Sequence, residues 1–311
     1  RVEQIFLTAG AQQGISLLTR LLLNPGGQVL TETITYPGIL QIIAPYQPEL
    51  FTIPTNHEAG IDVNTLEQVL RKGARPAFIY MVTDGHNPLG VSLNLTKRKR
   101  LVELACQYRI PILEDDPYGF LAYDGASLPP LRAFDEQWVY YIGSCSKILA
   151  PSLRVGWIVV PENLIHRLSA TKETIDLDTA TFAQHTVSTL LESGLFSKHI
   201  EMLQKEYKVR RDAMHQALQS EFSVEEVQWR KPTNGLYFWV KFAKTIDTEA
   251  FLKMAITDER VAFLPGQSFC ATAGTRAAHC ARLNFSSNPP ERIREGIARF
   301  ARAVRCFNHW K

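Results

Sequence analysis

Cysteine is scarce in this sequence of 311 residues, and the few cysteines do not indicate a disulfide framework. They are odd in number, widely spaced and without a C-x-x-C pair, which favours a reducing compartment such as the cytoplasm. The eight histidines form no H-E-x-x-H pattern and no close pair, so we expect no metal site. The cysteines are Cys106, Cys145, Cys270, Cys280 and Cys306.

Long hydrophobic runs and a strong net charge are also missing. No apolar run reaches membrane-spanning length and no signal peptide is visible, so we expect no membrane segment. The net charge of +3 is too small to indicate a nucleic-acid-binding surface. With 45% hydrophobic and 21% charged residues, the composition is that of a globular protein with one large or two moderate domains.

The most informative stretch is residues 141–156, in which Lys147 follows Ser144 and Ser146 and precedes Arg154. Strand-like apolar runs lead into and out of this stretch. A lysine held between buried strands is costly to keep charged, and a neutral amine forms a Schiff base with an aldehyde. Serines and an arginine beside it suit a phosphate. One cofactor needs both features, pyridoxal 5'-phosphate. The alternative is a solvated surface lysine, so the rest of the chain must supply partners.

Strands and helices alternate through the first half of the chain. Alternation of this kind predicts an α/β fold with a mostly parallel sheet and crossover helices. The predicted strands cover residues 1–8, 28–32, 50–54, 77–83 and 110–113, and the predicted helices cover residues 13–23, 63–70 and 96–108.

Polar and aromatic side chains follow the carboxyl ends of several predicted strands: Tyr36, Asn87, Asp115, Tyr118 and Lys147. Ligands of parallel α/β sheets bind at this edge. A buried carboxylate would keep a pyridine nitrogen protonated, while an amide and a tyrosine hydroxyl would donate to a phenolic ring oxygen. Taken singly, each residue also fits an ordinary turn or helix cap.

The turn before the first predicted helix contains Gly10, Ala11 and Gln12. Backbone amides at a helix N-terminus form an anion site, so this turn is a second candidate for a phosphate. A plain tight turn between strand and helix is the alternative.

Several short motifs occur together and in a fixed order. They are Gly10-Ala-Gln-Gln, Thr35-Tyr-Pro-Gly, Asn87-Pro-Leu-Gly, Glu114-Asp-Asp-Pro-Tyr-Gly, Ser144-Cys-Ser-Lys-Ile-Leu-Ala-Pro-Ser-Leu-Arg-Val-Gly and Arg282-Leu-Asn-Phe. With them the chain resembles the class I/II, fold-type I aminotransferases that depend on pyridoxal phosphate. Within that family it resembles the branch shared by kynurenine/aminoadipate-type transaminases and the aminotransferase-like domains of GntR/MocR-type regulators. The resemblance covers essentially the whole chain.

The resemblance implies roles for the residues around the cofactor ring. Lys147 would form the aldimine and later move the proton between Cα and the cofactor. Asp115 would pair with the pyridine nitrogen. Asn87 and Tyr118 would bond the ring hydroxyl, and Tyr36 would stack on the ring.

The resemblance also implies a phosphate site and a substrate site. Arg282 would clamp the α-carboxylate of the substrate by a bidentate fork, with Asn87 beside it. The phosphate would be held by Gly10, Ala11, Gln12, Ser144, Ser146 and Arg154. The expected substrates are an amino acid and a 2-oxo acid.

The implied fold has a large domain with a mostly parallel, seven-stranded type of sheet and a smaller C-terminal α+β domain. We expect the large, cofactor-binding domain in residues 1–195, and a linking helix with the small domain in residues 196–311. The resemblance further implies a homodimer with its active sites near the interface.

The chain departs from the family pattern in three places. Leu89 stands where the family usually has threonine, and Asn234 replaces one glycine of a Pro-x-Gly-Gly turn. The N-terminal segment that lines the substrate pocket in the family is not in the sequence, and we expect residues upstream of Arg1.

Three functions remain open from the sequence. The first is a cytoplasmic aminotransferase, which we favour. The second is the effector domain of a GntR/MocR-type regulator, which would bind DNA only if a winged-helix domain preceded this chain. The third is another fold-type I reaction, such as a β-lyase or a decarboxylase, since these differ mainly in the substrate pocket.

Overall fold

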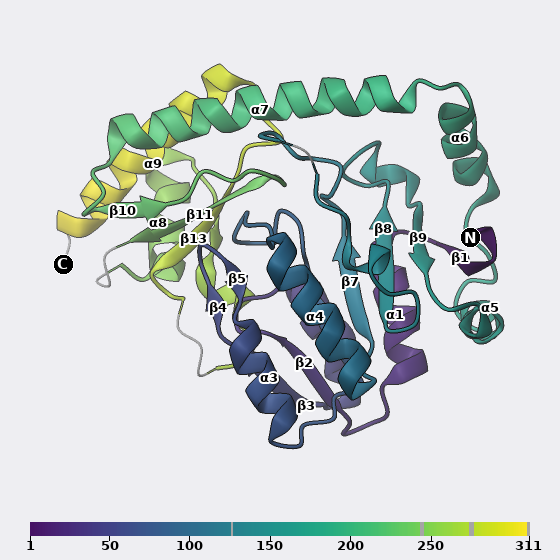
Figure 1. Ribbon diagram of the computed structural model, residues 1–311. Helices are drawn as coiled ribbons and strands as arrows, with labels where there is room; N and C mark the ends of the chain where they lie inside the picture. Colours follow the sequence, from purple (N-terminus) through teal and green to yellow (C-terminus); the bar gives the residue numbers. More distant parts are fainter. Residues whose placement is uncertain (126, 243–245, 274–276, 310–311) are drawn as a thin grey trace.

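A seven-stranded sheet forms the centre of the larger part of the fold (Figure 1). The computed structural model describes residues 1–125, 127–242, 246–273 and 277–309. The strands of this sheet are β1 (Ile5–Thr8), β2 (Gln28–Glu32), β3 (Glu49–Ile53), β6 (Phe78–Met81), β7 (Ile112–Asp116), β8 (Val139–Ser144) and β9 (Gly156–Val159).

The strand order is β1-β9-β8-β7-β6-β2-β3. Strand β9 is antiparallel to both of its neighbours, and the other pairings are parallel. The mostly parallel sheet predicted from the sequence is therefore confirmed. The carboxyl ends of β2, β6, β7 and β8 meet at one edge, where the predicted polar residues follow them.

Helices cover both faces of this sheet, and strand β6 shows how one strand contributes to both. Phe78 and Tyr80 join the core cluster that contains side chains of α1, α2 and α5, whereas Ile79 and Met81 join the cluster formed with α3 and α4. Successive side chains of a strand point to opposite faces, so an unbroken apolar run builds two cores. The helices are α1 (Ala11–Leu22), α2 (Pro37–Ile43), α3 (Val63–Arg71), α4 (Leu95–Tyr108), α5 (Ile165–Glu173) and α6 (Thr181–Glu192).

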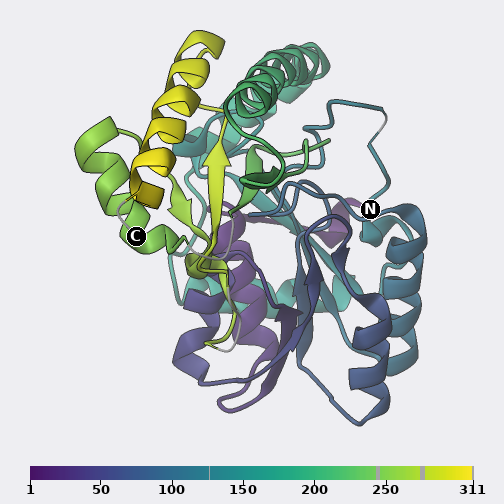
Figure 2. The same cartoon turned by 90° about the vertical axis from the view of Figure 1, so that its left-hand side faces the viewer.

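A second, four-stranded antiparallel sheet belongs to the smaller part of the fold, with the order β10-β11-β13-β12. Helix α7 (Phe196–Glu221) links the two parts along the top of Figure 1 and packs beside α9 (Pro290–His309), as Figure 2 also shows. The remaining elements are β4 (Thr55–Asn56), β5 (Gly60–Ile61), β10 (Val227–Trp229), β11 (Tyr237–Phe242), α8 (Thr248–Glu259), β12 (Leu264–Pro265) and β13 (Cys280–Asn284).

The presence of a seven-stranded and a four-stranded sheet fits the expected division into a large and a small domain. The domain boundary between residues 195 and 196 stays a prediction. The described residues include no helix that is both long and apolar enough to cross a bilayer.

The sequence prediction was wrong at the N-terminus and at two helix starts. Residues Val2–Gln4 form a 3₁₀ helix, in which the backbone N–H of Gln4 donates to the carbonyl of Arg1, so strand β1 begins at Ile5 rather than at Arg1. Helix α1 begins at Ala11 rather than Gln13, because the turn at Gly10 already directs the chain into the helix. Helix α4 begins at Leu95 rather than Thr96, because Asn94 is its N-cap and accepts a 2.9 Å hydrogen bond from the backbone of Lys97. Asp62 is the N-cap of α3, since its side chain accepts hydrogen bonds from the backbone at the start of that helix.

Candidate active site

A cavity of about 330 Å³ lies at the carboxyl edge of the large sheet, where side chains of both sheets line it. All the residues singled out from the sequence line it except Gly10, which is the N-cap of α1. The predicted residues that line the cavity are Ala11, Gln12, Tyr36, Asn87, Asp115, Tyr118, Ser144, Ser146, Lys147, Arg154 and Arg282.

Asp115 is a buried carboxylate near the end of β7. Its Oδ2 accepts a 2.7 Å hydrogen bond from the hydroxyl of Tyr80, whereas its Oδ1 has no partner among the described residues. Burial raises the pKa of Asp115 to about 7, the bond from Tyr80 lowers it, and the charge of Asp116 raises it further. The site therefore holds a carboxylate with a free oxygen, and a cationic N–H donor would stabilise its ionised form.

The start of α1 and Arg154 form an anion-binding corner of the cavity. Gly10 has a φ of 88°, and a Cβ built on it would overlap Nη2 of Arg154. Only glycine allows this approach. Nη1 of Arg154 donates a 3.1 Å hydrogen bond to Oγ of Ser146, and the first backbone amides of α1 have no partner within the helix. A guanidinium, hydroxyls and a helix N-terminus suit a phosphate group.

Lys147 follows the end of β8 and is half-buried in the cavity wall. Tyr36 lines the same cavity, and its hydroxyl donates a 3.2 Å hydrogen bond to Oε1 of Gln12. A Cβ on Gly38 would overlap the Tyr36 ring, so the glycine leaves room for that ring. Burial raises the pKa of Tyr36, and the charge of Asp115 adds to the effect.

Arg282 reaches the cavity from the small sheet. It lies in β13, and its Nη1 donates a 2.6 Å hydrogen bond to Oδ1 of Asn87. Its Nε is buried and has no partner among the described residues. Burial lowers the pKa of Arg282, an effect that the hydroxyls of Tyr237 and Tyr118 oppose. A guanidinium with one edge fixed and donors left over can bind a carboxylate.

Two residues at this site were missed by the sequence reasoning, Tyr80 and Tyr237. Tyr80 could have been found, because strand alternation places it on the same face of the sheet as Asp115 in the neighbouring strand. Tyr237 gives no such signal: it begins β11 in the other sheet and contacts Tyr118 across 119 residues of sequence.

The two residues that depart from the family pattern, Leu89 and Asn234, are both buried. Leu89 is 3% exposed and joins a cluster with Trp239 and Phe269. Asn234 is buried, and its backbone bridges to Ala122. Leu89 therefore packs in a buried apolar cluster and does not line the cavity.

The residues present fit pyridoxal phosphate. The free Oδ1 of Asp115 matches the need of a pyridinium N–H for an acceptor, and the corner at Gly10 and Arg154 matches the need of the phosphate. Lys147 supplies the amine in the same cavity. The carboxylate, the anion-binding corner and the amine thus all lie in one cavity of this chain.

Comparisons with known proteins agree with the site. The family model described as aminotransferase class I and II matches residues 1–300. The aromatic-amino-acid aminotransferase 1 of Thermococcus litoralis is 40% identical over 306 residues, which are 97% of this chain and 72% of that protein.

Solved structures show the same fold. A kynurenine aminotransferase from Pyrococcus horikoshii, in complex with PMP, has a TM-score of 0.91 and 38% identity, covering 97% of this chain and 74% of its own. An α-aminoadipate aminotransferase from Thermus thermophilus, complexed with N-(5'-phosphopyridoxyl)-L-leucine, has a TM-score of 0.93 and 33% identity, covering 100% of this chain and 79% of its own.

A transcriptional regulator of Bacillus subtilis, YisV, matches less of this chain. It is 30% identical over 248 residues, which are 79% of this chain and 51% of the regulator. The chain belongs to the class I and II aminotransferases, and it is a pyridoxal-phosphate-dependent enzyme that transfers an amino group between an amino acid and a 2-oxo acid.

Proposed function

We propose that Lys147, Asp115 and Arg282 are the central residues of this transamination. One observation carries the proposal: a single cavity brings together an amine, a buried carboxylate with a free oxygen, an anion-binding corner and a guanidinium. Bound pyridoxal phosphate supplies an electron sink that stabilises negative charge at Cα of the amino acid.

In this proposal each residue acts on a stated part of the cofactor or substrate. Lys147 would hold the cofactor through its amine, and once the amino group of the substrate has displaced that amine, its free Nζ would accept the proton released from Cα. Asp115 keeps the pyridine nitrogen protonated through its free Oδ1. Asn87 and Tyr118 bond the ring oxygen, and Tyr36 packs on the ring.

The remaining polar residues bind charge. The phosphate is held by the backbone at Gly10, Ala11 and Gln12 and by Ser144, Ser146 and Arg154. Arg282 binds the α-carboxylate of the substrate with the donors that Asn87 leaves free.

We propose an aromatic amino acid as the preferred donor. Three tyrosines, Tyr36, Tyr118 and Tyr237, line the cavity, and the cations among the described lining residues are Lys147, Arg154 and Arg282. Each of these cations has a role above, so none of the described ones is left for a second carboxylate. The 40% identical relative, whose name specifies aromatic amino acids, supports this choice.

The test uses purified protein loaded with pyridoxal phosphate and a panel of phenylalanine, tyrosine, kynurenine and 2-aminoadipate. Conversion of the cofactor to its pyridoxamine form is followed by absorbance. We expect the aromatic donors to convert it fastest, and Lys147→Ala to convert none of it. Equal conversion by the Lys147→Ala protein would overturn the assignment, and a clear preference for 2-aminoadipate would overturn the substrate class.

We also propose that the enzyme is a homodimer. Phe182 is 84% exposed, Leu177 79% and Val2 74%. Phe182 lies in α6, Leu177 just before α6 and Val2 just before β1, and these elements lie at one end of the molecule in Figure 1. Large apolar side chains exposed in one region are typical of an interface. Light scattering should give twice the mass of one chain, and Phe182→Asp should lower it. A fully active monomer would contradict the proposal.

A reducing compartment such as the cytoplasm fits the cysteines. All five are free, and Cys145 and Cys280 are buried. Thiol titration of the denatured protein, purified without reductant, should find five thiols per chain. Fewer thiols would indicate a disulfide and a different compartment.

The regulator alternative is supported only by partial relatives such as YisV, of which this chain matches half. Turnover distinguishes the two functions. A regulator's effector domain would bind pyridoxal phosphate and an amino acid without sustained production of the 2-oxo acid, whereas the enzyme should produce it continuously when a second 2-oxo acid is present.

A further inference from the structure

Tyr237 lies where the small sheet enters the active-site cavity, and backbone contacts with the large domain fix its position. Just before it, the backbone N–H of Gly235 donates a 3.2 Å hydrogen bond to the carbonyl of Leu121. A Cβ on Gly85 would lie 2.7 Å from the Cα of Gly235, so the two glycines allow two loops to touch. Tyr237 is therefore held by the loops on which Asn87 and Tyr118 lie.

The ring of Tyr237 packs against the guanidinium of Arg282. The guanidinium carbon is 4.0 Å from the centroid of that ring and 5.1 Å from the centroid of Phe269. Because Nη1 is bonded to Asn87, the guanidinium is held by one hydrogen bond and by aromatic rings. Its unpartnered Nε is then presented in a fixed direction.

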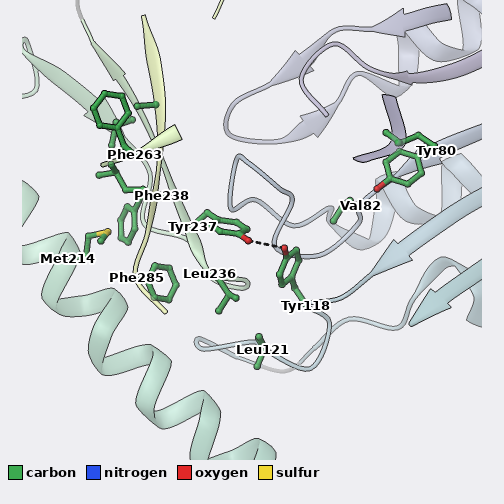
Figure 3. Close-up of a cluster of buried hydrophobic side chains, with 14 of the residues drawn as sticks. Tyr80, Val82, Tyr118, Leu121, Met214, Leu236, Tyr237, Phe238, Phe263 and Phe285 are labelled. Atoms are coloured by element: carbon green, nitrogen blue, oxygen red, sulfur yellow. Dashed lines mark hydrogen bonds between the residues drawn. The ribbon is translucent and has the colours of Figure 1, made fainter. Parts of the chain in front are cut away.

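The hydroxyl of Tyr237 forms a second contact, with Tyr118 (Figure 3). The Tyr118 hydroxyl donates a 3.3 Å hydrogen bond to it, and the two buried rings meet edge to face with centroids 5.9 Å apart. Burial raises the pKa of Tyr118 well above its ordinary value, so Tyr118 keeps its proton at neutral pH. If Tyr118 donates its proton to the ring oxygen of a bound cofactor instead, the Tyr237 hydroxyl can donate to Tyr118, and the bond between the two tyrosines is maintained.

We propose that Tyr237 is a positioning residue that couples the substrate carboxylate site to the cofactor ring: its ring orients Arg282 and its hydroxyl supports Tyr118. The inference rests on the roles proposed above for Arg282 and Tyr118. It assigns separate functions to two parts of one side chain, and two substitutions separate them. Tyr237→Phe keeps the ring and removes the hydroxyl, whereas Tyr237→Leu removes both.

A purely structural role is the competing explanation, because Tyr237 is buried and belongs to the main core cluster. A matched control is available in β8, where Tyr140 is 6% exposed and does not line the cavity. Tyr140→Phe removes a tyrosine hydroxyl from the same core without reaching the site. Thermal unfolding of each cofactor-loaded variant shows whether it is folded.

The experiment measures two properties of the cofactor-loaded protein that do not require turnover. The first is the dissociation constant of 3-phenylpropionate, which has a carboxylate but no amine, from its effect on the cofactor absorbance. The second is the pH midpoint of the cofactor absorbance change. We expect Tyr237→Leu to weaken 3-phenylpropionate binding roughly tenfold to thirtyfold, the magnitude of a cation–π contact that is largely desolvated. Tyr237→Phe should leave this affinity within about twofold.

The hydroxyl is tested by the second measurement. Tyr237→Phe should raise the pH midpoint. Without the Tyr237 hydroxyl, Tyr118 is held less firmly and stabilises the deprotonated form of the cofactor site less well. Tyr140→Phe should leave the midpoint unchanged. Unchanged affinity in Tyr237→Leu would overturn the role of the ring, and an unchanged midpoint in Tyr237→Phe would overturn the role of the hydroxyl. If Tyr237→Leu does not fold, the role of the ring is tested by Tyr237→Met, which fills the site without an aromatic ring and should bind 3-phenylpropionate about tenfold more weakly than Tyr237→Phe. A wild-type protein that binds 3-phenylpropionate yet transaminates nothing would contradict the proposed function and leave the role of Tyr237 standing.

Discussion

The Tyr80 hydroxyl donates a 2.7 Å hydrogen bond to Oδ2 of Asp115, and Oδ1 of the same carboxylate has no partner among the described residues. The two oxygens therefore have different tasks. Tyr80 fixes the orientation of the carboxylate and favours its ionised form, and the other oxygen remains available for a ligand.

Replacing Asp115 by alanine should separate binding from chemistry. The phosphate site is untouched, so the variant should retain some pyridoxal phosphate, but it should lose most of its proton-transfer activity because the ring nitrogen has no anionic partner. The rate at which the protein exchanges the Cα proton of phenylalanine in deuterated water measures this step. Unchanged exchange would show that Asp115 has only a structural role.

Tyr80→Phe should weaken cofactor binding in a pH-dependent way. Losing the Tyr80 bond raises the pKa of Asp115 above its value of about 7, so a larger fraction is protonated at neutral pH. Titration of the cofactor-free protein with pyridoxal phosphate should show binding weakened about tenfold at pH 7 and less at pH 9, where the carboxylate is ionised in both proteins. Tyr140→Phe is the control. An equal loss at both pH values would contradict the explanation.

The sequence predicted which residues lie at the edge of the cavity because a local pattern identifies each of them. Each polar residue follows a strand whose apolar pattern is visible, and parallel strands bring those ends together whatever the loop lengths are. The sequence alone therefore predicted that Asp115 and Lys147 lie at one edge of the sheet, and both line the cavity there.

Contacts between the two sheets could not be predicted in this way. Arg282 and Asn87 are separated by 195 residues, and no periodicity relates β13 to the loop after β6. The family resemblance supplied Arg282, while Tyr237 was missed because an aromatic residue in a strand is ordinarily part of the core. The predicted start of α4 was one residue too late because the sequence offers two good N-cap residues, Asn94 and Thr96. Only the hydrogen bond that the backbone of Lys97 donates to Asn94 decides between them.

The cofactor-free protein should lose stability as the pH rises from about 4 to about 7. Burial raises the pKa of Glu114 to about 7, of Asp115 to about 7 and of Asp116 to about 6. Over this range the folded state binds more protons than the unfolded state, so raising the pH favours unfolding. Each such group contributes a slope of up to about 1.4 kcal/mol per pH unit.

The variant Asp115→Asn isolates one of these groups. Its free energy of unfolding in urea should decline less steeply with pH than that of the wild type, so the difference between the two proteins should grow between pH 5 and pH 7. Titrating groups that do not interact with Asp115 cancel in the comparison. Parallel curves would show that Asp115 does not titrate in this range.

Lys147 should carry the cofactor covalently. Borohydride reduction of the loaded protein followed by peptide mapping should place the cofactor on Lys147. Lys172 provides an internal control, because it is also a partly enclosed lysine but its Nζ is paired with Asp176 at 2.7 Å. A cofactor found on Lys172, or on any other lysine, would contradict the assignment.

Arg282→Lys should weaken substrate binding while cofactor content stays near normal. Lysine keeps the charge but cannot bond Asn87 and a carboxylate in one planar arrangement, so one charge-assisted hydrogen bond worth about 1.5–3 kcal/mol is lost. Spectral titration of the loaded protein with phenylalanine should show affinity reduced roughly tenfold to a hundredfold.

Arg154→Lys tests cofactor binding in the way that Arg282→Lys tests substrate binding, because Arg154 lies in the anion-binding corner beside Ser146. It should reduce the affinity for pyridoxal phosphate, while the fully loaded variant should bind phenylalanine normally. The two arginines then separate cofactor binding from substrate binding. If Arg282→Lys binds phenylalanine as tightly as the wild type does, Arg282 is not the carboxylate site, and its bond to Asn87 serves only to join the two sheets.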